Sequence, residues 1–216
     1  MDTRKEYYQK QAQVIINNMK KRKFDAYYCD SLIEAEEKVV ELLGDNKSIG
    51  YGGSMTMEEN SVKEYLIEKG YNVIIRENYK TEEEIQELKK KLVTCDAFFM
   101  SSNAVTMDGE LINCDGTSNR LSYLLYGPKE VYLLVGMNKV TNTREEGLNR
   151  VYNVAAPLNA IRLNRDTPCS KCGECRECYE NTICCNTVIT RASRDPGKIK
   201  VLLIGEELGY WYWFLV

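Results

Sequence analysis

The sequence predicts an α/β protein built on a mostly parallel sheet with helices on both faces. Short apolar runs alternate with amphipathic stretches of about ten to fifteen residues, which is the pattern of repeated strand–helix–strand units. Glycine-rich and carboxylate-rich segments follow several of the apolar runs, as they do in proteins whose sites lie beyond strand ends. With 216 residues, the chain is long enough for one domain with a full core. We therefore expect a single domain over residues 1–216.

The expected elements follow one another without an internal repeat. Residues 4–23 are predicted to form an amphipathic helix, because Ala12, Ile15 and Met19 fall on one face at helical spacing. The other expected elements are strands at 24–29, 47–50, 71–76, 95–100, 130–135, 187–191 and 198–204, and helices at 32–43, 57–68, 121–126 and 143–152, with one more opening at Thr81.

Composition excludes some classes of function. The net charge is −3 with scattered Lys and Arg, so the basic stripe of a nucleic-acid-binding protein is missing. The sequence has no run long enough to span a bilayer and no N-terminal signal-peptide core, so we expect a cytoplasmic protein. Histidine is absent, which excludes imidazole catalysis and histidine metal ligands. The apolar end at 211–216 is expected to pack on the core, or else to form a docking tail or a homo-oligomer contact.

A glycine loop stands between an expected strand and an expected helix. In Gly50-x-Gly52-Gly53-Ser54-x-Thr56, the glycines let backbone N–H groups approach an anion, and the two hydroxyls add donors. The alternative is a tight turn followed by a helix cap. Two adjacent glycines followed by two hydroxyls exceed what a cap requires, so an anion-binding role is favoured.

The stretch 101–120 is the second candidate site. It follows the apolar run 97–100 and concentrates polar and charged side chains where a strand is expected to end. We expect Asp115 and Glu110 to act as base or nucleophile, and Arg120 to hold an anion. The other expected lining residues are Asn103, Asn119, Asn138 and Lys139. The alternative treats Asp108-Gly109 and Asp115-Gly116 as hairpin turns around a short strand at 111–113.

The nine cysteines are the third unusual feature, because six of them lie between Cys169 and Cys185. In a reducing compartment such a cluster favours metal binding over disulfides, and thiolates at this spacing suit a [4Fe–4S] cluster or zinc. The spacing differs from the bacterial ferredoxin run, which has three residues before its fourth cysteine and a proline after it. Free thiols are the alternative. Of the scattered cysteines, Cys114 beside Asp115 is the candidate for reactivity.

Several motifs together resemble the lactate-utilisation (LUD, formerly DUF162) family. They are GYGGSMT, SSNAVTMDGELINCDGTSNR, LLVGMNKV and AAPLNAIRL, in that order. The resemblance implies a Rossmann-like open sheet, similar to the group of ribose-phosphate isomerase, glucosamine-phosphate deaminase and coenzyme A transferase. It also implies a link to the oxidation of lactate or other organic acids. Some single-domain members show P-C-x5-C-x2-C-x6-C, which implies Cys169, Cys175, Cys178 and Cys185 as ligands, with Cys172 and Cys184 as alternatives.

Two hypotheses about function remain open from the sequence. One is an enzyme or enzyme subunit that binds a small anionic metabolite, such as an organic acid, an acyl-coenzyme A or a sugar phosphate. The other is a non-catalytic iron–sulfur or zinc module, with the cysteine-rich insertion at 168–186 serving a redox-protein partner or a sensor. The glycine loop and the stretch 101–120 favour the first, and the clustered cysteines favour the second.

Overall fold

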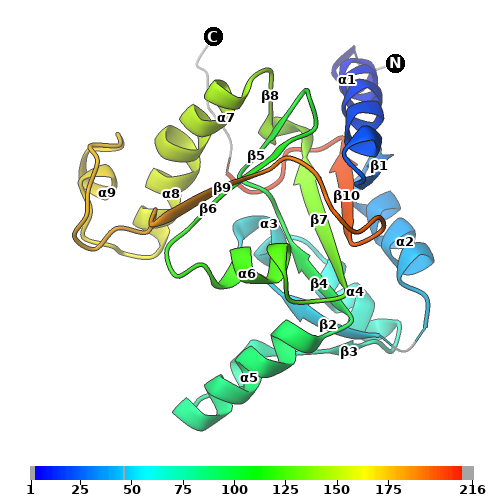
Figure 1. The fold of residues 1–216 in the computed structure, drawn as a ribbon, viewed down its shortest axis with the longest axis horizontal. Helices are drawn as coiled ribbons and strands as arrows, with labels where there is room; N and C mark the ends of the chain where they lie inside the picture. The colour runs from blue at the N-terminus through cyan, green and yellow to red at the C-terminus, as the bar shows by residue number, and fades with distance from the viewer. Residues whose placement is uncertain (1–2, 46, 211–216) are drawn as a thin grey trace.

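The computed structural model describes residues 3–45 and 47–210, so the expectation for the apolar end at 211–216 lies outside the described residues. Within the described part, the main sheet has six strands, all parallel, in the order β1-β10-β7-β4-β2-β3 (Figure 1). These strands are β1 (Asp25–Cys29), β10 (Ile199–Ile204), β7 (Glu130–Gly136), β4 (Ala97–Met100), β2 (Ser48–Tyr51) and β3 (Asn72–Val73). The predicted parallel sheet is confirmed.

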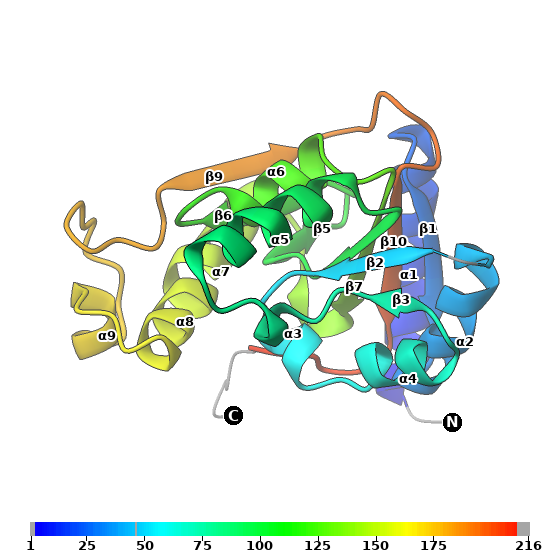
Figure 2. The same cartoon turned by 90° about the horizontal axis from the view of Figure 1, so that it is seen from below.

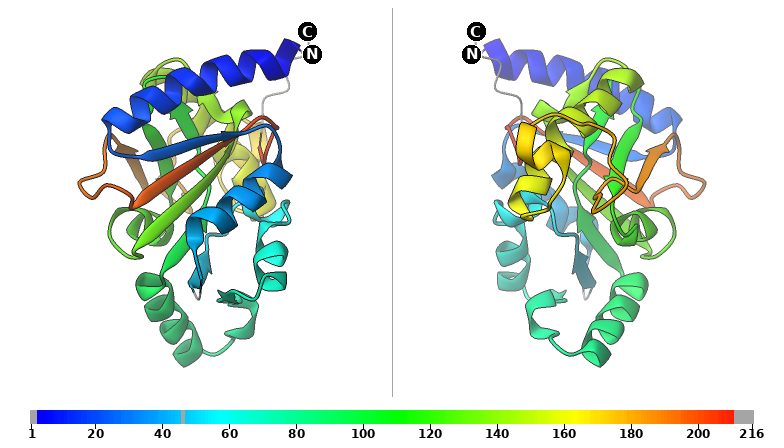
Figure 3. Two further views of the ribbon diagram at one scale, coloured as in Figure 1. Left: turned by 90° about the vertical axis from the view of Figure 1, so that its right-hand side faces the viewer. Right: turned by 90° about the vertical axis from the view of Figure 1, so that its left-hand side faces the viewer.

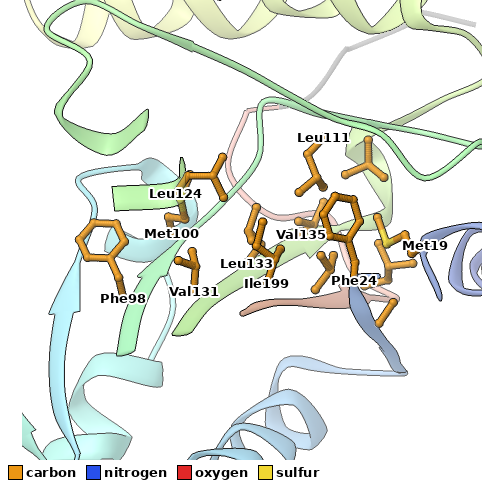
Figure 4. Packing of buried hydrophobic residues seen from close by; sticks show 14 of the residues in the cluster. Met19, Phe24, Phe98, Met100, Leu111, Leu124, Val131, Leu133, Val135 and Ile199 are labelled. Carbon is orange, nitrogen blue, oxygen red and sulfur yellow. The ribbon is translucent and has the colours of Figure 1, made fainter. Parts of the chain in front are cut away.

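Helices cover both faces of this sheet. Successive side chains of a strand point to opposite faces, so neighbouring residues of β4 contact different helices. Phe98 points to the face covered by α1 (Thr3–Lys21), α5 (Glu82–Thr94) and α6 (Asn119–Leu125), where Figure 4 shows part of the core. Phe99 points to the face covered by α2 (Leu32–Leu43), α3 (Met55–Glu58) and α4 (Val62–Glu68). Figure 3 shows α1 lying along the first of these faces. A strand buried on both faces reads as a continuous apolar run, which explains why AFFM was recognisable as a strand.

Two expected elements are wrong in their extent. The expected helix 57–68 is two short helices, α3 and α4, separated at Asn60. The Asn60 side chain donates to the Thr56 carbonyl and accepts from the Val62 amide at 3.0 Å, so it satisfies backbone groups at both helix ends. The expected strand 71–76 pairs only over Asn72–Val73, and a 3-10 turn, η1 (Arg76–Asn78), follows it closely.

A second sheet, absent from the sequence prediction, stands beside the first. Its strands are β8 (Val140–Thr141), β5 (Ala104–Thr106), β6 (Leu111–Asp115) and β9 (Asn186–Thr190), in that order. The antiparallel β5–β6 hairpin turns at Asp108-Gly109, where Gly109 has a φ of +83°, so the turn interpretation of that pair is confirmed. Figure 2 shows β9 running along the outer side of this sheet.

One long helical segment packs on the second sheet. It comprises α7 (Arg144–Arg150), the π-helical turn η3 (Val151–Ala155) and α8 (Ala156–Arg162). Gly147 permits the close approach, because a Cβ there would lie 2.4 Å from the Ile112 side chain. The chain continues through the short α9 (Pro168–Cys172), which lies beside α8 at the left edge of Figure 1, and returns through the cysteine-rich segment to β9. No helix in the described ranges is long and apolar enough to cross a membrane.

Candidate functional site

A cavity of about 1080 Å³ lies beyond the carboxyl ends of β2, β4 and β7. The helical segment α7–η3–α8, which packs on the second sheet, forms its other side. Ligands bind beyond the carboxyl ends of strands in open α/β sheets. All but two of the residues expected to form the pocket line it. They are Gly52, Gly53, Ser54, Thr56, Asn103, Asp115, Asn119, Arg120 and Lys139. The structure therefore brings the glycine loop and the stretch 101–120 to one place, although they are separate in the sequence.

The lining is strongly cationic in a chain that is anionic as a whole. It holds seven Lys and Arg side chains against two carboxylates, whereas the complete chain carries −3. The cations are Arg76, Lys89, Arg120, Lys139, Arg150, Arg162 and Arg165, and the carboxylates are Glu58 and Asp115. One of those carboxylates, Glu58, is already paired with Arg162 at 3.1 Å. A concave wall of one charge concentrates ligands of the opposite charge, so the cavity favours anions.

The glycine loop is both a turn and part of this wall. The Gly52 amide donates to the Phe99 carbonyl at 2.8 Å, which fixes the loop to β4. The Ser54 hydroxyl accepts from the Met57 amide at 3.3 Å and caps α3. Side-chain space at Gly53 is limited, because a Cβ there would lie 3.3 Å from the Arg76 guanidinium. The cap interpretation is therefore confirmed, and the loop still faces the cavity.

Lys139 is a buried basic residue among those predicted. It belongs to the 3-10 turn η2 (Met137–Lys139) that follows β7, and it is 6% exposed. Its Nζ donates to the hydroxyls of Thr56 and Ser101, the latter at 2.8 Å. No carboxylate in the described part of the chain lies within ion-pair distance of this nitrogen. Burial lowers the pKa of Lys139 well below its usual value, and the charges of Arg150 and Arg120 lower it further.

The Arg120 guanidinium is held mainly by the protein itself. It donates to the carbonyls of Ser101 (3.2 Å) and Cys114 (2.7 Å) and to the side-chain oxygens of Asn113 (3.4 Å) and Asn103 (3.0 Å). These contacts tie the end of β4 to the second sheet. They leave few donors for a ligand, so Arg120 supplies positive charge and rigidity to the cavity more than direct hydrogen bonds.

Arg150 was missed by the sequence analysis. It lies at the end of α7, is 4% exposed, and donates to the carbonyls of Asn103 and Tyr210. The sequence contains a pattern that could have identified it, because Arg150 lies at helical spacing from Gly147, Val151 and Val154. All four residues are buried in the structure. An arginine on the apolar stripe of a helix is a candidate for function, because charged residues are rarely buried without a purpose.

Asp115 and Asn119 stand where β6 turns into α6. One Asp115 carboxylate oxygen accepts from the Leu121 amide at 3.2 Å, which holds this side chain at the start of the helix. The Asn119 side chain accepts from the Arg120 amide at 2.8 Å. The chain passes from β6, which ends at Asp115, into α6, with Ser118 at a φ of +59° just before the helix. Asp115-Gly116 is therefore not a hairpin turn. Both side chains face the cavity and remain candidate ligand contacts.

Glu110 and Asn138 do not line the cavity. Glu110 is 5% exposed and accepts two hydrogen bonds from Arg144, at 3.0 and 2.8 Å, which lower its pKa. This pairing gives Glu110 a structural role, so we do not retain it as a base. The Asn138 amide donates to the Leu208 and Tyr210 carbonyls and accepts from the Leu208 amide at 3.2 Å. It thus anchors the segment 205–210, whose Tyr210 reaches the cavity.

The six clustered cysteines do not converge on one point. Cys169 is buried on α9, Cys172 and Cys185 are exposed, and the other three are half-buried. Among residues 3–45 and 47–210, no three cysteine or carboxylate side chains are placed to hold one metal ion. The residues therefore do not fit a metal or a cluster in this arrangement. Only a rearranged segment 168–186 would gather four thiolates.

Cys184, one of these six cysteines, lies on the cavity wall beside Cys114 of β6. Both thiols line the cavity, and the neighbouring Ile183 backbone packs against Gly116. A hydrogen bond from the Cys184 thiol lowers the pKa of Cys114 to about 7, against burial, which raises it. Cys114 is therefore not a simple packing residue like Cys29 and Cys95, for which burial raises the pKa to about 11.

Comparison with known proteins gives one structure of similar fold and one matching family. The chain is similar to a DUF162 family protein from Deinococcus radiodurans, with a TM-score of 0.51 over 93% of this chain and 98% of that chain. The two sequences are 15% identical, so this likeness concerns the fold alone. No match was found among the curated proteins. The family profile described as LUD domain matches residues 12–204. Since this match spans most of the sequence, the chain belongs to the LUD domain family.

Proposed function

We propose that this protein acts in organic-acid metabolism of the lactate-utilisation type by binding a small anionic metabolite in the cavity. The observation that carries the proposal is a pair of basic side chains, the buried Lys139 and the half-buried Arg120. Within the described residues, neither has a carboxylate at ion-pair distance, and both face the same cavity. Family membership supports the general class of metabolism.

Buried charge is the physical reason for expecting an anion. Taking an ammonium or guanidinium group out of water is costly unless a partner of opposite charge compensates. A ligand carboxylate or phosphate would supply that partner to Arg120, and to Lys139 once this amine takes up a proton as the anion binds, with the charge of Arg150 adding to the attraction. Organic acids, acyl-coenzyme A and sugar phosphates all carry such a group. The cavity of about 1080 Å³ has room for each class.

If the protein is an enzyme, Asp115 is the candidate base. Its carboxylate lies on the cavity wall, and the hydrogen bond from the Leu121 amide fixes its orientation. A positioned carboxylate can remove a proton from a bound ligand. Asn103 and Asn119 would complete the polar lining around it.

Titration calorimetry with lactate, acetyl-coenzyme A and ribose 5-phosphate tests the proposal. We expect one of these to bind, and Lys139→Met to weaken that binding at least tenfold. Asp115→Asn should leave binding within about threefold of wild type, because this change removes a negative charge and not an anion contact. Lys5→Met, at an exposed site on α1, is the matched control. The proposal fails if none of the three ligands binds wild-type protein.

A metal-binding role is the second candidate, favoured by the six cysteines gathered in 168–186. We propose that this segment holds a [4Fe–4S] cluster or zinc after rearranging, with Cys169, Cys175 and Cys178 joined by Cys185 or Cys184. The half-buried Cys184 is nearer to the body of the protein than the exposed Cys185. Anaerobic purification followed by metal analysis and an absorption spectrum tests this. Loss of metal in Cys175→Ser but not in Cys172→Ser supports the set, and metal-free folded protein excludes it.

Three broader expectations belong to the same proposal. A relationship to the isomerase, deaminase and coenzyme A transferase group is supported by the open parallel sheet with its cavity at strand ends. A cytoplasmic location and a redox-protein partner are proposed from the many clustered cysteines of the sequence and the family's metabolic class. Formation of a homo-oligomer is tested by light scattering on the purified chain.

A further inference from the structure

We propose that Lys139 is an imine-forming amine that reacts with the carbonyl group of a 2-oxo acid. This inference rests on the proposed anion-binding function and deepens it by naming the substrate class and a covalent step. It starts from the position of Lys139, a buried lysine whose nitrogen faces a large cavity. The hydroxyls of Thr56 and Ser101 are its hydrogen-bond partners.

The hydroxyl partners suit a neutral amine. The Ser101 hydroxyl donates its own hydrogen to the Leu134 carbonyl at 2.7 Å, so it can only accept from Lys139. A neutral amine has two N–H groups and one lone pair. With both N–H groups donated to Ser101 and Thr56, the lone pair is left for the remaining direction, away from the two hydroxyls. An ammonium ion held in the same place would have one hydrogen without a protein acceptor.

The surrounding charges also favour the neutral form. Burial lowers the pKa of Lys139, and the guanidinium groups of Arg150 on α7 and Arg120 on α6 act in the same direction. Glu59, at the end of α3, opposes them but lies beyond ion-pair distance. Lysines desolvated next to other cations are the ones that attack carbonyl groups, because only the free amine is a nucleophile.

The same cations define the substrate. In a 2-oxo acid the carbonyl carbon is bonded directly to the carboxylate. A carboxylate attracted by Arg120 and Arg150 would therefore bring the carbonyl carbon close to the Lys139 nitrogen. A carbonyl compound without an anionic group would lack this attraction. The geometry thus favours an acid with an adjacent carbonyl over a neutral aldehyde or ketone.

The reaction is balanced without an oxidant or a reductant. The nitrogen lone pair forms a bond to the carbonyl carbon, and the carbonyl π pair moves to oxygen. A proton passes from nitrogen to that oxygen, and the Thr56 hydroxyl is placed to relay it. The C–O bond then breaks, oxygen leaves as water with a second proton from nitrogen, and a C=N bond remains. Amine and oxo acid are thereby converted into imine and water.

Reductive trapping tests the inference. Wild-type protein is incubated with pyruvate or glyoxylate and sodium cyanoborohydride, and then analysed by intact mass and peptide mapping. We expect one adduct per chain, heavier by the mass of the acid minus one oxygen atom, on the peptide that contains Lys139. Absence of an adduct with both acids overturns the proposal. So does an adduct on Lys89 at the cavity rim or on surface lysines.

Two variants and one binding measurement complete the design. Lys139→Arg keeps a long basic side chain that cannot form an imine, so the adduct should be absent from this variant, whereas Lys5→Arg should give the wild-type adduct. Calorimetry with pyruvate separates the two proposals. Binding without an adduct overturns the imine and leaves anion binding intact. If pyruvate and glyoxylate neither bind nor react, the imine is overturned, and the three ligands of the previous test decide whether anion binding survives.

Discussion

At the scale of single residues, the basic side chains of Lys139 and Arg120 line the cavity without a carboxylate at ion-pair distance among the described residues. Lys139 donates to two hydroxyls, and Arg120 donates to carbonyls and amides. Neutral partners compensate only part of the cost of removing a cation from water. These two side chains therefore lower the stability of the ligand-free protein, as residues in binding sites commonly do.

We predict that Lys139→Met stabilises the ligand-free protein at neutral pH by about 1–2 kcal/mol. The lysine pKa is lowered in the folded state by burial and by Arg150 and Arg120, against Glu59, so the unfolded chain binds its proton more tightly. Stability of the wild type should then rise with pH from the lowered pKa up to 10.5, the unperturbed value. Over that range the advantage of Lys139→Met should shrink, which urea unfolding at several pH values measures. A constant or growing advantage would contradict the assignment, with Lys5→Met as control.

The sequence predicted which residues lie at the cavity where the chemistry of a side chain and its position after a strand agree. Thr56 and Lys139 were predicted because hydroxyl and cationic side chains follow expected strands. The prediction was wrong for Glu110 and Asn138, which do not line the cavity. Glu110 is bonded to Arg144, and Asn138 is bonded to the segment 205–210. Which way a side chain points beyond a strand end depends on tertiary contacts that no local pattern encodes.

At the scale of elements, the end of β7 and the turn after it fix the position of the segment 205–210. Gly136 makes room for it, because a Cβ there would lie 2.7 Å from both the Glu206 carbonyl and the Leu208 amide. Gly209, with a φ of +65°, brings the segment against Thr56 at the cavity. Asn138 then fastens it through its hydrogen bonds to Leu208.

Asn138→Ala should release this segment without unfolding the sheet. The variant removes the acceptor of the Leu208 amide, and we expect a loss of about 1–2 kcal/mol in stability from the hydrogen bonds. Hydrogen exchange at Leu208 should become at least tenfold faster, while exchange in β7 stays as in the wild type. Asn149→Ala, at an exposed position on α7, is the control. Unchanged exchange at Leu208 would show that other contacts hold the segment.

Elements were predictable in proportion to their length and burial. The helix 4–23 was recognised because its apolar residues repeat at helical spacing, and the strands 130–135 and 198–204 because they are mainly apolar runs. The second sheet was missed because β8 and β5 have two and three residues, too short for any period to show. Its longer strands, β6 and β9, are far apart in sequence, and only the fold pairs them.

At the scale of the whole molecule, the cavity joins parts that are otherwise separate. The main sheet, the second sheet and the segment 205–210 each contribute to its wall, for example through Thr56, Asn103 and Tyr210. An anion bound among them would stabilise all three together. A ligand that binds only the folded state at 100 times its Kd should add about 2.7 kcal/mol to the free energy of unfolding.

Thermal unfolding with the anion identified by calorimetry checks this. We expect Tm to rise with ligand concentration at constant ionic strength, in a single transition for both sheets. Lys139→Met should show little or no rise, because the ligand loses its buried partner. A rise of equal size in this variant would place the stabilising anion elsewhere on the protein.

The position of β10 in the main sheet has a consequence for how the chain is made. β10 lies between β1 and β7, so the first strand of the sheet pairs with the last. A ribosome adds about 5–20 residues per second, so β1 waits about 9 to 35 seconds for its partner. During that time the edge of β1 is open to other strands, and so is the edge of β7 once that strand has been made. Synthesis therefore passes through a long-lived intermediate with an unfinished sheet, a natural substrate for a chaperone that shields strand edges.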